Sequence, residues 1–160
     1  MGFLYNTYMD DFIFENPDHP FAIRPNAMAY SSMSPTIVQE NDENVLVLGS
    51  PGSSRIISSV AQVTAKWIEN KSINSLIKAS RIHVSGNAIY MENKKDTSLI
   101  GANFLKKYDL QFRFPKEGLV VGNGLNPYYG GIHAIAKQDN SWFGVADPRR
   151  DGKAIVIFDE

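Results

Sequence analysis

Residues 45–55 read VLVLGSPGSSR, which predicts a β-strand, a tight turn and the start of a helix. Such a turn leaves backbone N–H groups free at a helix N-terminus, where they suit an anion or a developing oxyanion. Gly49 and Gly52 let the backbone turn tightly, and Ser53 or Ser54 can cap the helix. Taken alone, the stretch fits both an ordinary strand-to-helix connection and an anion-binding turn.

Polar residues lie close to this turn in the predicted topology. A strand at 36–39 and the strand at 45–48 form a hairpin around 41–44. The register of that hairpin places Ser31 and Ser32 at the same end as the turn. Asp10 and Asp11 follow a predicted strand at 2–8, where adjacent carboxylates can hold a cationic group or a metal, or simply cap a turn.

The remaining pattern mixes hairpins with a few helices. Residues 15–30 and 117–131 are predicted loops, and His19 and His83 are interpreted as a solvated and a structural histidine. We expect helices at 55–69, 73–77 and 98–108, and strands at 81–85, 88–91, 110–114, 132–137, 142–146 and 154–158. This order favours an α+β sandwich with mainly antiparallel sheets over a doubly wound parallel fold.

Composition narrows the functional classes. The chain has 160 residues, 43% of them hydrophobic, so it can bury a sizeable core. Its net charge of −1 gives no basic surplus for nucleic acid. It contains no cysteine, which excludes disulfides, thiol catalysis and thiolate zinc sites. We expect neither a membrane helix nor a signal peptide in its apolar pattern.

Five blocks occur in order along the chain: GFLYNTYMDDF at 2–12, SSMSPTIV at 31–38, GSPGSSRII at 49–57, KASRIH at 78–83 and FGVADPR at 143–149. They resemble the segments G-I-L-L-N-N-Q-M-D-D-F, S-S-M-S-P-T-I-V, G-S-P-G-G-S-R-I-I, A-P-R-x-H and Y-G-A-S-D-P-R of the gamma-glutamyltranspeptidase small subunit. The matches span nearly the whole chain, and five ordered blocks are more specific than any single motif.

This resemblance implies the N-terminal-nucleophile hydrolase fold, an αββα four-layer sandwich. Residues 1–160 would form a single-domain portion, the C-terminal part of the small subunit. In the family, a proenzyme cleaves itself before a threonine, whose freed amine acts as the base. The threonine attacks a γ-glutamyl amide such as glutathione. The resulting γ-glutamyl ester passes to water or to an amino-acid acceptor.

The resemblance also assigns roles to residues. Asp11 would hold the substrate α-ammonium, Ser31 and Ser32 its α-carboxylate, and the amides of Gly52 and Ser53 the oxyanion, without a metal or cofactor. The threonine would lie upstream of Gly2, so the chain would need the large-subunit portion of the same protein and be inactive alone. A periplasmic, secreted or cell-surface location is implied in the same way.

Three departures leave alternatives open. Tyr8 occupies the substrate-binding position where the family commonly has glutamine, and Ser53 replaces its second glycine. Only about 20 residues separate Asp11 from Ser31, which implies that a lid loop is missing. The alternatives are a catalytically inactive remnant that binds a small zwitterion or anion, and a lid-less relative acting on poly-γ-glutamate or acylated β-lactams.

Overall fold

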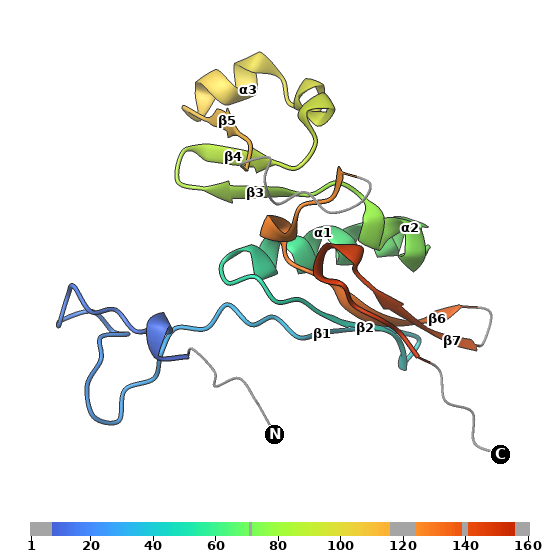
Figure 1. Cartoon of the computed structure of the whole chain (residues 1–160), viewed down its shortest axis with the longest axis horizontal. Helices are drawn as coiled ribbons and strands as arrows, with labels where there is room; N and C mark the ends of the chain where they lie inside the picture. The colour runs from blue at the N-terminus through green and yellow to red at the C-terminus, as the bar shows by residue number, and fades with distance from the viewer. Residues whose placement is uncertain (1–7, 71, 116–123, 139–140, 156–160) are drawn as a thin grey trace. The chain divides into compact units, whose positions relative to one another are not determined.

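The computed structural model describes residues 8–70, 72–115, 124–138 and 141–155 (Figure 1). The chain divides into two compact units, Met1–Ser32 and Met33–Glu160. Each unit is described by itself below.

The first unit contains the 3₁₀ helix η1 (Tyr8–Asp11) and a long loop. Within this loop Ile13 pairs with Ala22 in an isolated bridge, and the Ile13 N–H donates to the Phe21 carbonyl at 2.9 Å. The loop predicted at 15–30 is therefore confirmed. Most of the strand predicted at 2–8 lies outside the described residues, and its last residue, Tyr8, begins η1.

The second unit is built on a four-stranded sheet in the order β1-β2-β6-β7, in which all neighbouring strands are antiparallel. The strands are β1 (Thr36–Glu40), β2 (Glu43–Gly49), β6 (His133–Gln138) and β7 (Ser141–Ala146). Thr36 pairs with Leu48, so the hairpin register predicted from the sequence is confirmed. The segment entering β1 and the turn leaving β2 thus lie at the same end of the hairpin.

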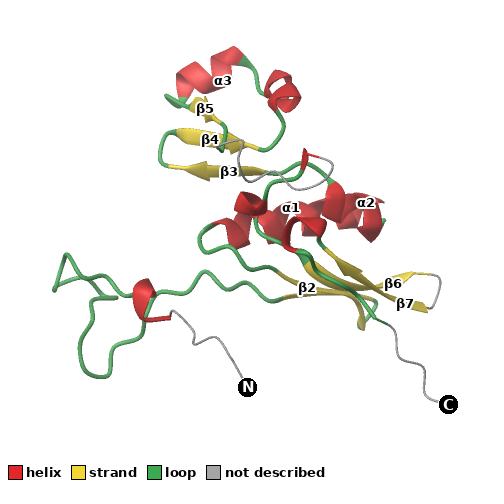
Figure 2. Cartoon of the chain, viewed as in Figure 1, coloured by secondary structure: helices red, strands yellow, loops and turns green. Residues whose placement is uncertain are grey.

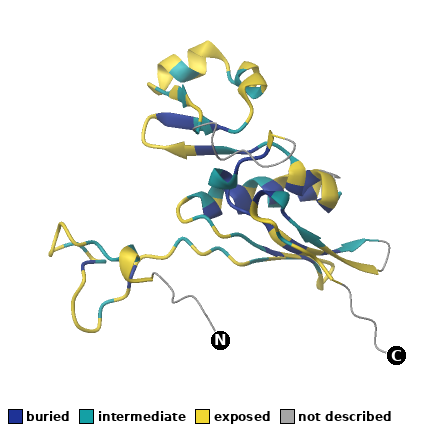
Figure 3. Cartoon of the chain, viewed as in Figure 1, coloured by how far each residue is buried: buried dark blue, intermediate teal, exposed yellow. Residues whose placement is uncertain are grey.

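Helices α1 (Arg55–Asn70) and α2 (Ile73–Lys78) cover one face of this sheet (Figure 2). Apolar residues of α1 recur every three to four positions, which places them on one side of the helix. They pack against the inward residues of β2 and β6, and Trp67 is 1% exposed. Figure 3 shows buried residues both on the helices and on the sheet that they cover. The core cluster comprises Leu46, Leu48, Ile56, Val60, Val63, Trp67, Ile73, Leu76, Ile77, Ile132, Ala134 and Ala136.

A smaller sheet has the order β3-β4-β5, formed by β3 (Ile82–Ser85), β4 (Ala88–Met91) and β5 (Gln111–Arg113). The β3–β4 hairpin turns at Gly86, whose φ of +57° suits glycine. β5 runs parallel to β4. The architecture is thus α+β with mainly antiparallel sheets, as the sequence predicts.

Some local predictions were wrong. In place of one helix at 98–108, the chain forms the 3₁₀ helix η2 (Lys94–Leu99) and α3 (Ala102–Lys107). Gly101 has an extended backbone and interrupts the pattern, which leaves Leu99 80% exposed instead of inward. Of the strand expected at 154–158, Ala154 and Ile155 form no strand, and the rest lies outside the described residues. Two further 3₁₀ helices are η5 (Pro127–Tyr129) and η6 (Pro148–Arg150).

Candidate functional site

The turn between β2 and α1 has the geometry of an anion-binding site. The Arg55 N–H donates to the Gly52 carbonyl at 3.2 Å and the Ile56 N–H to the Ser53 carbonyl at 2.9 Å, so the carbonyl groups close the first turn of the helix. Among the described residues, none accepts a hydrogen bond from the amide of Gly52 or Ser53. Two unused donors at the N-terminus of a 16-residue helix favour negative charge.

Positive φ angles shape this turn. Gly52 has a φ of +138°, and a Cβ placed on it would lie 3.2 Å from the Gly130 Cα. Ser53 has a φ of +54°, in the left-handed region that disfavours residues with a side chain. Ser53 therefore carries local backbone strain at a position where the resembling segment has glycine.

We expect Ser53→Gly to raise the free energy of unfolding by about 0.5–1 kcal/mol, because glycine adopts this φ without the steric cost that serine carries. Ser54→Gly is the matched control, since Ser54 is equally exposed and is not among the positive-φ residues. There glycine adds only chain entropy to the unfolded state and should be neutral or destabilising. Urea unfolding measures both, and equal effects would contradict the strain at Ser53.

Within the first unit, a backbone hydrogen bond links the segments that carry the predicted substrate-binding residues Asp11 and Ser31. Asp11 ends η1, and the Tyr30 N–H donates to the Asp11 carbonyl at 3.2 Å. The backbone of Asp11 is thus bonded to the residue that immediately precedes Ser31, although the two are far apart in sequence. Tyr8 is 40% exposed at the start of the same 3₁₀ helix. Gly52 and Ser53 belong to the second unit.

His83 lies beneath the start of α1 and is 7% exposed. Its Nδ1 is 3.0 Å from the Ser58 Oγ, and that hydroxyl donates to the Arg55 carbonyl at 3.1 Å. The hydroxyl proton is therefore used, which assigns a proton to Nδ1 of the neutral ring. Burial, and next the positive charge of Arg55, lower the pKa of His83. These contacts agree with the structural role predicted for this histidine.

The lowered pKa of His83 predicts a pH dependence of stability. The unfolded chain binds a proton on His83 near pH ~6.5, whereas the folded chain does so only at lower pH. Stability should therefore be fully present above that unfolded value and decrease as the pH falls through the folded pKa. The contribution of His83 to the slope of stability against pH should vanish in His83→Gln. It should persist in His133→Gln, which changes an exposed histidine. Unfolding midpoints between pH 7.5 and 5 test this, and identical profiles in both variants would contradict it.

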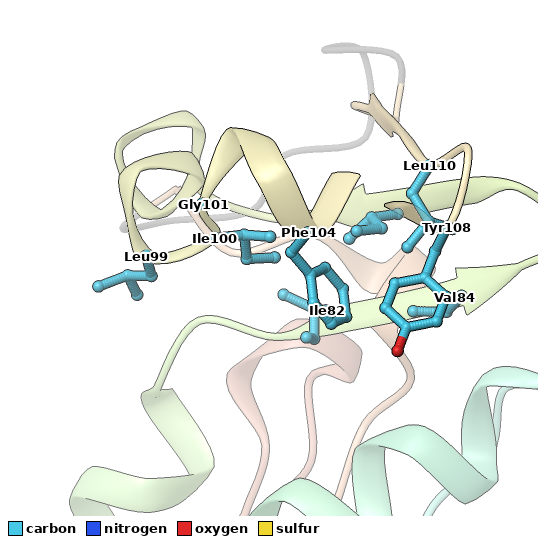
Figure 4. Close-up of a pocket in the computed structure, with 9 residues that line it drawn as sticks. Ile82, Val84, Leu99, Ile100, Gly101, Phe104, Tyr108 and Leu110 are labelled. Atoms are coloured by element: carbon cyan, nitrogen blue, oxygen red, sulfur yellow. The ribbon is translucent and has the colours of Figure 1, made fainter. Parts of the chain in front are cut away.

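A cavity of about 800 Å³ lies between α3 and the smaller sheet. Figure 4 shows the rings of Phe104 and Tyr108 beside Ile82 and Val84, and the two ring centroids are 4.8 Å apart. Apart from the Tyr108 hydroxyl, the side chains lining this cavity are apolar. The side chains lining this cavity therefore include no carboxylate and no histidine.

A model of the family described as gamma-glutamyltranspeptidase matches residues 1–157. The chain belongs to the gamma-glutamyltranspeptidase family. The resemblance of the five sequence blocks is thereby confirmed.

Individual members of the gamma-glutamyltranspeptidase family show the extent of the match. The glutathione hydrolase proenzyme of Bacillus subtilis is 29% identical over 166 residues, covering 98% of this chain and 25% of the relative. The capsule biosynthesis protein CapD proenzyme of Bacillus anthracis is 25% identical over 155 residues, covering 94% of this chain and 26% of the relative. The chain thus spans about a quarter of the length of these curated relatives.

A solved structure of a gamma-glutamyltranspeptidase has a similar fold. The structure of gamma-glutamyltranspeptidase from Pseudomonas nitroreducens complexed with L-DON has 28% identity and a TM-score of 0.73, covering 98% of this chain and 83% of that chain.

Within the residues that the structure describes, no helix is both long and apolar enough to cross a membrane. Over the same residues, no group of three or more His, Asp or Glu side chains is arranged to hold a metal ion.

Two of the blocks typical of the gamma-glutamyltranspeptidase family, 78–83 and 143–149, meet in a buried ion network. The Arg81 Nη2 is 2.6 Å from the Asp147 Oδ2, and the Arg149 Nη1 is 3.2 Å from the Asp147 Oδ1. The Arg149 Nη2 is also 2.6 Å from the Glu92 Oε2. All four side chains are at most 2% exposed. The network ties α2, β4 and the end of β7 together.

Sequence reasoning matched these blocks to the family without assigning the network. Burial opposes ionisation of Asp147, but the Arg81 guanidinium and the backbone N–H groups of Arg149 and Ile132 hold its pKa below the usual range. Glu92 directly follows the last residue of β4. The sequence signal for the network was the arginine in each of these two family blocks, because a buried guanidinium group needs buried partners.

Proposed function

We propose that this chain provides the substrate-binding residues and the oxyanion hole of an N-terminal-nucleophile hydrolase that acts on γ-glutamyl amides such as glutathione. The observation that carries the proposal is the pair of amides without acceptors, Gly52 and Ser53, at the start of α1 in a member of this family. We further propose that residues 1–160 are part of one domain, which a preceding large-subunit portion of the same protein completes. The proenzyme would cleave itself immediately before the nucleophilic threonine.

In this mechanism the threonine Oγ attacks the γ-carbonyl carbon while its own α-amine takes the hydroxyl proton. The carbonyl oxygen becomes negatively charged, and the amides of Gly52 and Ser53 donate to it. Collapse of the intermediate breaks the C–N bond, and the amine leaves with the proton. Water or an amino-acid amine then attacks the γ-glutamyl ester and frees the threonine. Asp11 would hold the substrate α-ammonium, and Ser31 and Ser32 its α-carboxylate.

The outer face of the four-stranded sheet supports the proposal that a further part of the protein packs against it. Ile37 pairs with Val47, and Val47 pairs with Ile135, so these three residues form a row across β1, β2 and β6. They alternate with the core residues and lie on the face away from α1, where they are exposed. An apolar face of this kind usually lies against another layer. A second sheet from the preceding portion of the same protein would cover it.

The test is to express the complete reading frame that includes this chain and to measure cleavage of γ-glutamyl-p-nitroanilide. We expect self-cleavage before a threonine, followed by turnover. Asp11→Asn should raise KM strongly because the substrate ammonium loses its ion-pair partner. Asp10→Asn removes the neighbouring, exposed carboxylate and should leave KM nearly unchanged. An upstream threonine without self-cleavage or turnover would contradict the proposal.

A second candidate is a non-catalytic module that binds a small zwitterion. It is favoured by Tyr8, which stands where the family commonly has glutamine, and by the left-handed serine at position 53. Calorimetric titration with glutamate and with glutathione separates the two. Binding that depends on Asp11, in a processed protein without turnover, would support the module, whereas turnover excludes it.

A further inference from the structure

The segment 127–131, named here the back loop, lies directly against the turn that precedes α1. A Cβ on Gly130 would lie 2.7 Å from the Pro51 carbonyl oxygen and 2.6 Å from the Ser50 Oγ, which is closer than real Cβ contacts allow. From the other side, a Cβ on Gly52 would lie 3.2 Å from the Gly130 Cα. The two backbones therefore touch with no side chain between them.

A single hydroxyl joins the two segments. The Ser50 Oγ accepts a hydrogen bond from the Gly131 N–H at 3.1 Å and donates one to the Pro51 carbonyl at 2.8 Å. The Pro51 carbonyl and the Gly52 N–H are opposite ends of one planar peptide group, which is trans. A hydrogen bond that holds this carbonyl therefore also sets the direction in which the Gly52 N–H points.

The second amide is oriented in a related way. The Gly52 carbonyl accepts from the Arg55 N–H at 3.2 Å, and the same peptide carries the Ser53 N–H. This bond belongs to the first turn of α1 and needs no other segment. The two amides are thus oriented separately, Ser53 by the helix and Gly52 by Ser50 and the back loop.

The back loop is itself held by side-chain donors. The Tyr128 carbonyl accepts from the Arg55 Nε at 3.0 Å. The Tyr129 carbonyl accepts from the Ser59 Oγ at 2.8 Å and from the Arg81 Nη1 at 3.0 Å. Arg55 and Ser59 are four residues apart and lie on the same side of α1. The loop is therefore fixed to the helix whose N-terminus forms the site.

We propose that Ser50 and Gly130 are positioning residues that aim the Gly52 amide at the developing oxyanion. This inference rests on the oxyanion role proposed above for Gly52. Neither residue needs to touch substrate, because both act on the far end of the peptide that carries the donor. A donor that is aimed only at the transition state affects kcat more than KM.

The test uses the processed full-length protein and two variant pairs. Gly130→Ala inserts a methyl group against the Pro51 carbonyl, whereas Gly124→Ala places one at another positive φ, +75° against +80°, where nothing lies within 4 Å. Ser50→Ala removes the bridging hydroxyl, and Ser50→Thr retains it. Removal of one oxyanion donor typically lowers kcat by about 10²–10³-fold, so a misaimed donor should lower it by roughly 10- to 100-fold.

We expect Gly130→Ala and Ser50→Ala to lower kcat with KM nearly unchanged, Gly124→Ala to retain kcat and Ser50→Thr to restore most of it. Equal kcat in Gly130→Ala and Gly124→Ala would overturn the inference. Crystal structures of the variants give a readout that does not require activity. If the wild-type protein has no γ-glutamyl turnover, the proposed function fails. The structural part of the inference, that Ser50 orients the Gly52 amide, then stands if the Pro51–Gly52 peptide rotates in Ser50→Ala and falls if it does not.

Discussion

Asp147→Asn should lower the free energy of unfolding by about 3–5 kcal/mol, because it leaves two buried arginines without their shared carboxylate. The wild-type side chain is fully buried and also accepts from the Ile132 N–H at 2.9 Å. An asparagine keeps the shape but loses the charge, and it turns an NH₂ group toward donors. Because a domain of this size is typically stable by only about 5–15 kcal/mol, this loss would remove a large share of its total stability.

Urea unfolding followed by tryptophan fluorescence measures the effect, since Trp67 lies in the core. Asp151→Asn is the matched control, because Asp151 is exposed, carries the same charge and has a left-handed φ of +51° that asparagine tolerates. It should change the stability by less than about 0.5 kcal/mol. Similar losses in both variants would show that the charge of the segment, and not the buried network, is responsible.

The same carboxyl group predicts an acid transition. The pKa of Asp147 is lower in the folded chain than in the unfolded chain, where it lies near ~3.9. Its stabilising contribution is therefore present above that value and is lost as the pH falls through the folded pKa. Asp147→Asn should accordingly show a weaker loss of stability on acidification than the wild type.

Gly52→Ala should lower kcat of the processed protein by about 10²–10³-fold, the usual cost of losing one oxyanion-hole donor. At a φ of +138° an alanine is strained, and its Cβ would press on the Gly130 backbone, so the turn must move. We also expect a loss of about 1–3 kcal/mol in stability, typical of a side chain in a sparsely populated conformation. Steady-state kinetics on γ-glutamyl-p-nitroanilide, below the unfolding transition, separates the two effects.

Gly49→Ala is the control for this substitution. Gly49 ends β2 three residues earlier, and nothing lies within 4 Å of the Cβ that alanine would add. It should retain kcat within about threefold, since it changes chain entropy and leaves the turn in place. Retention of full kcat in Gly52→Ala would show that the Gly52 amide does not stabilise the oxyanion.

The strand-turn-helix unit at 45–55 could be predicted from the sequence because each part has a local cause. The apolar run, the Gly-Ser-Pro-Gly turn and the spacing from Ile56 to Trp67 act over a few residues, and the structure places β2 and α1 there. The helix at 98–108 could not be placed correctly, since apolar spacing alone does not reveal that Gly101 breaks it. The parallel pairing of β5 with β4 likewise cannot be predicted from the local sequence pattern.

The sequence by itself determined the family, through five ordered blocks that span nearly the whole chain. It also determined the hairpin register and the turn before α1, because these depend on residues close together in the chain. The tertiary structure alone decided what holds that turn. Gly130 and Gly131 are about 80 residues downstream of Ser50 and Gly52, and their contact exists only because β6 pairs with β2 and brings the back loop beneath the helix. The burial of Asp147 between two arginines was decided in the same way, by packing between distant segments.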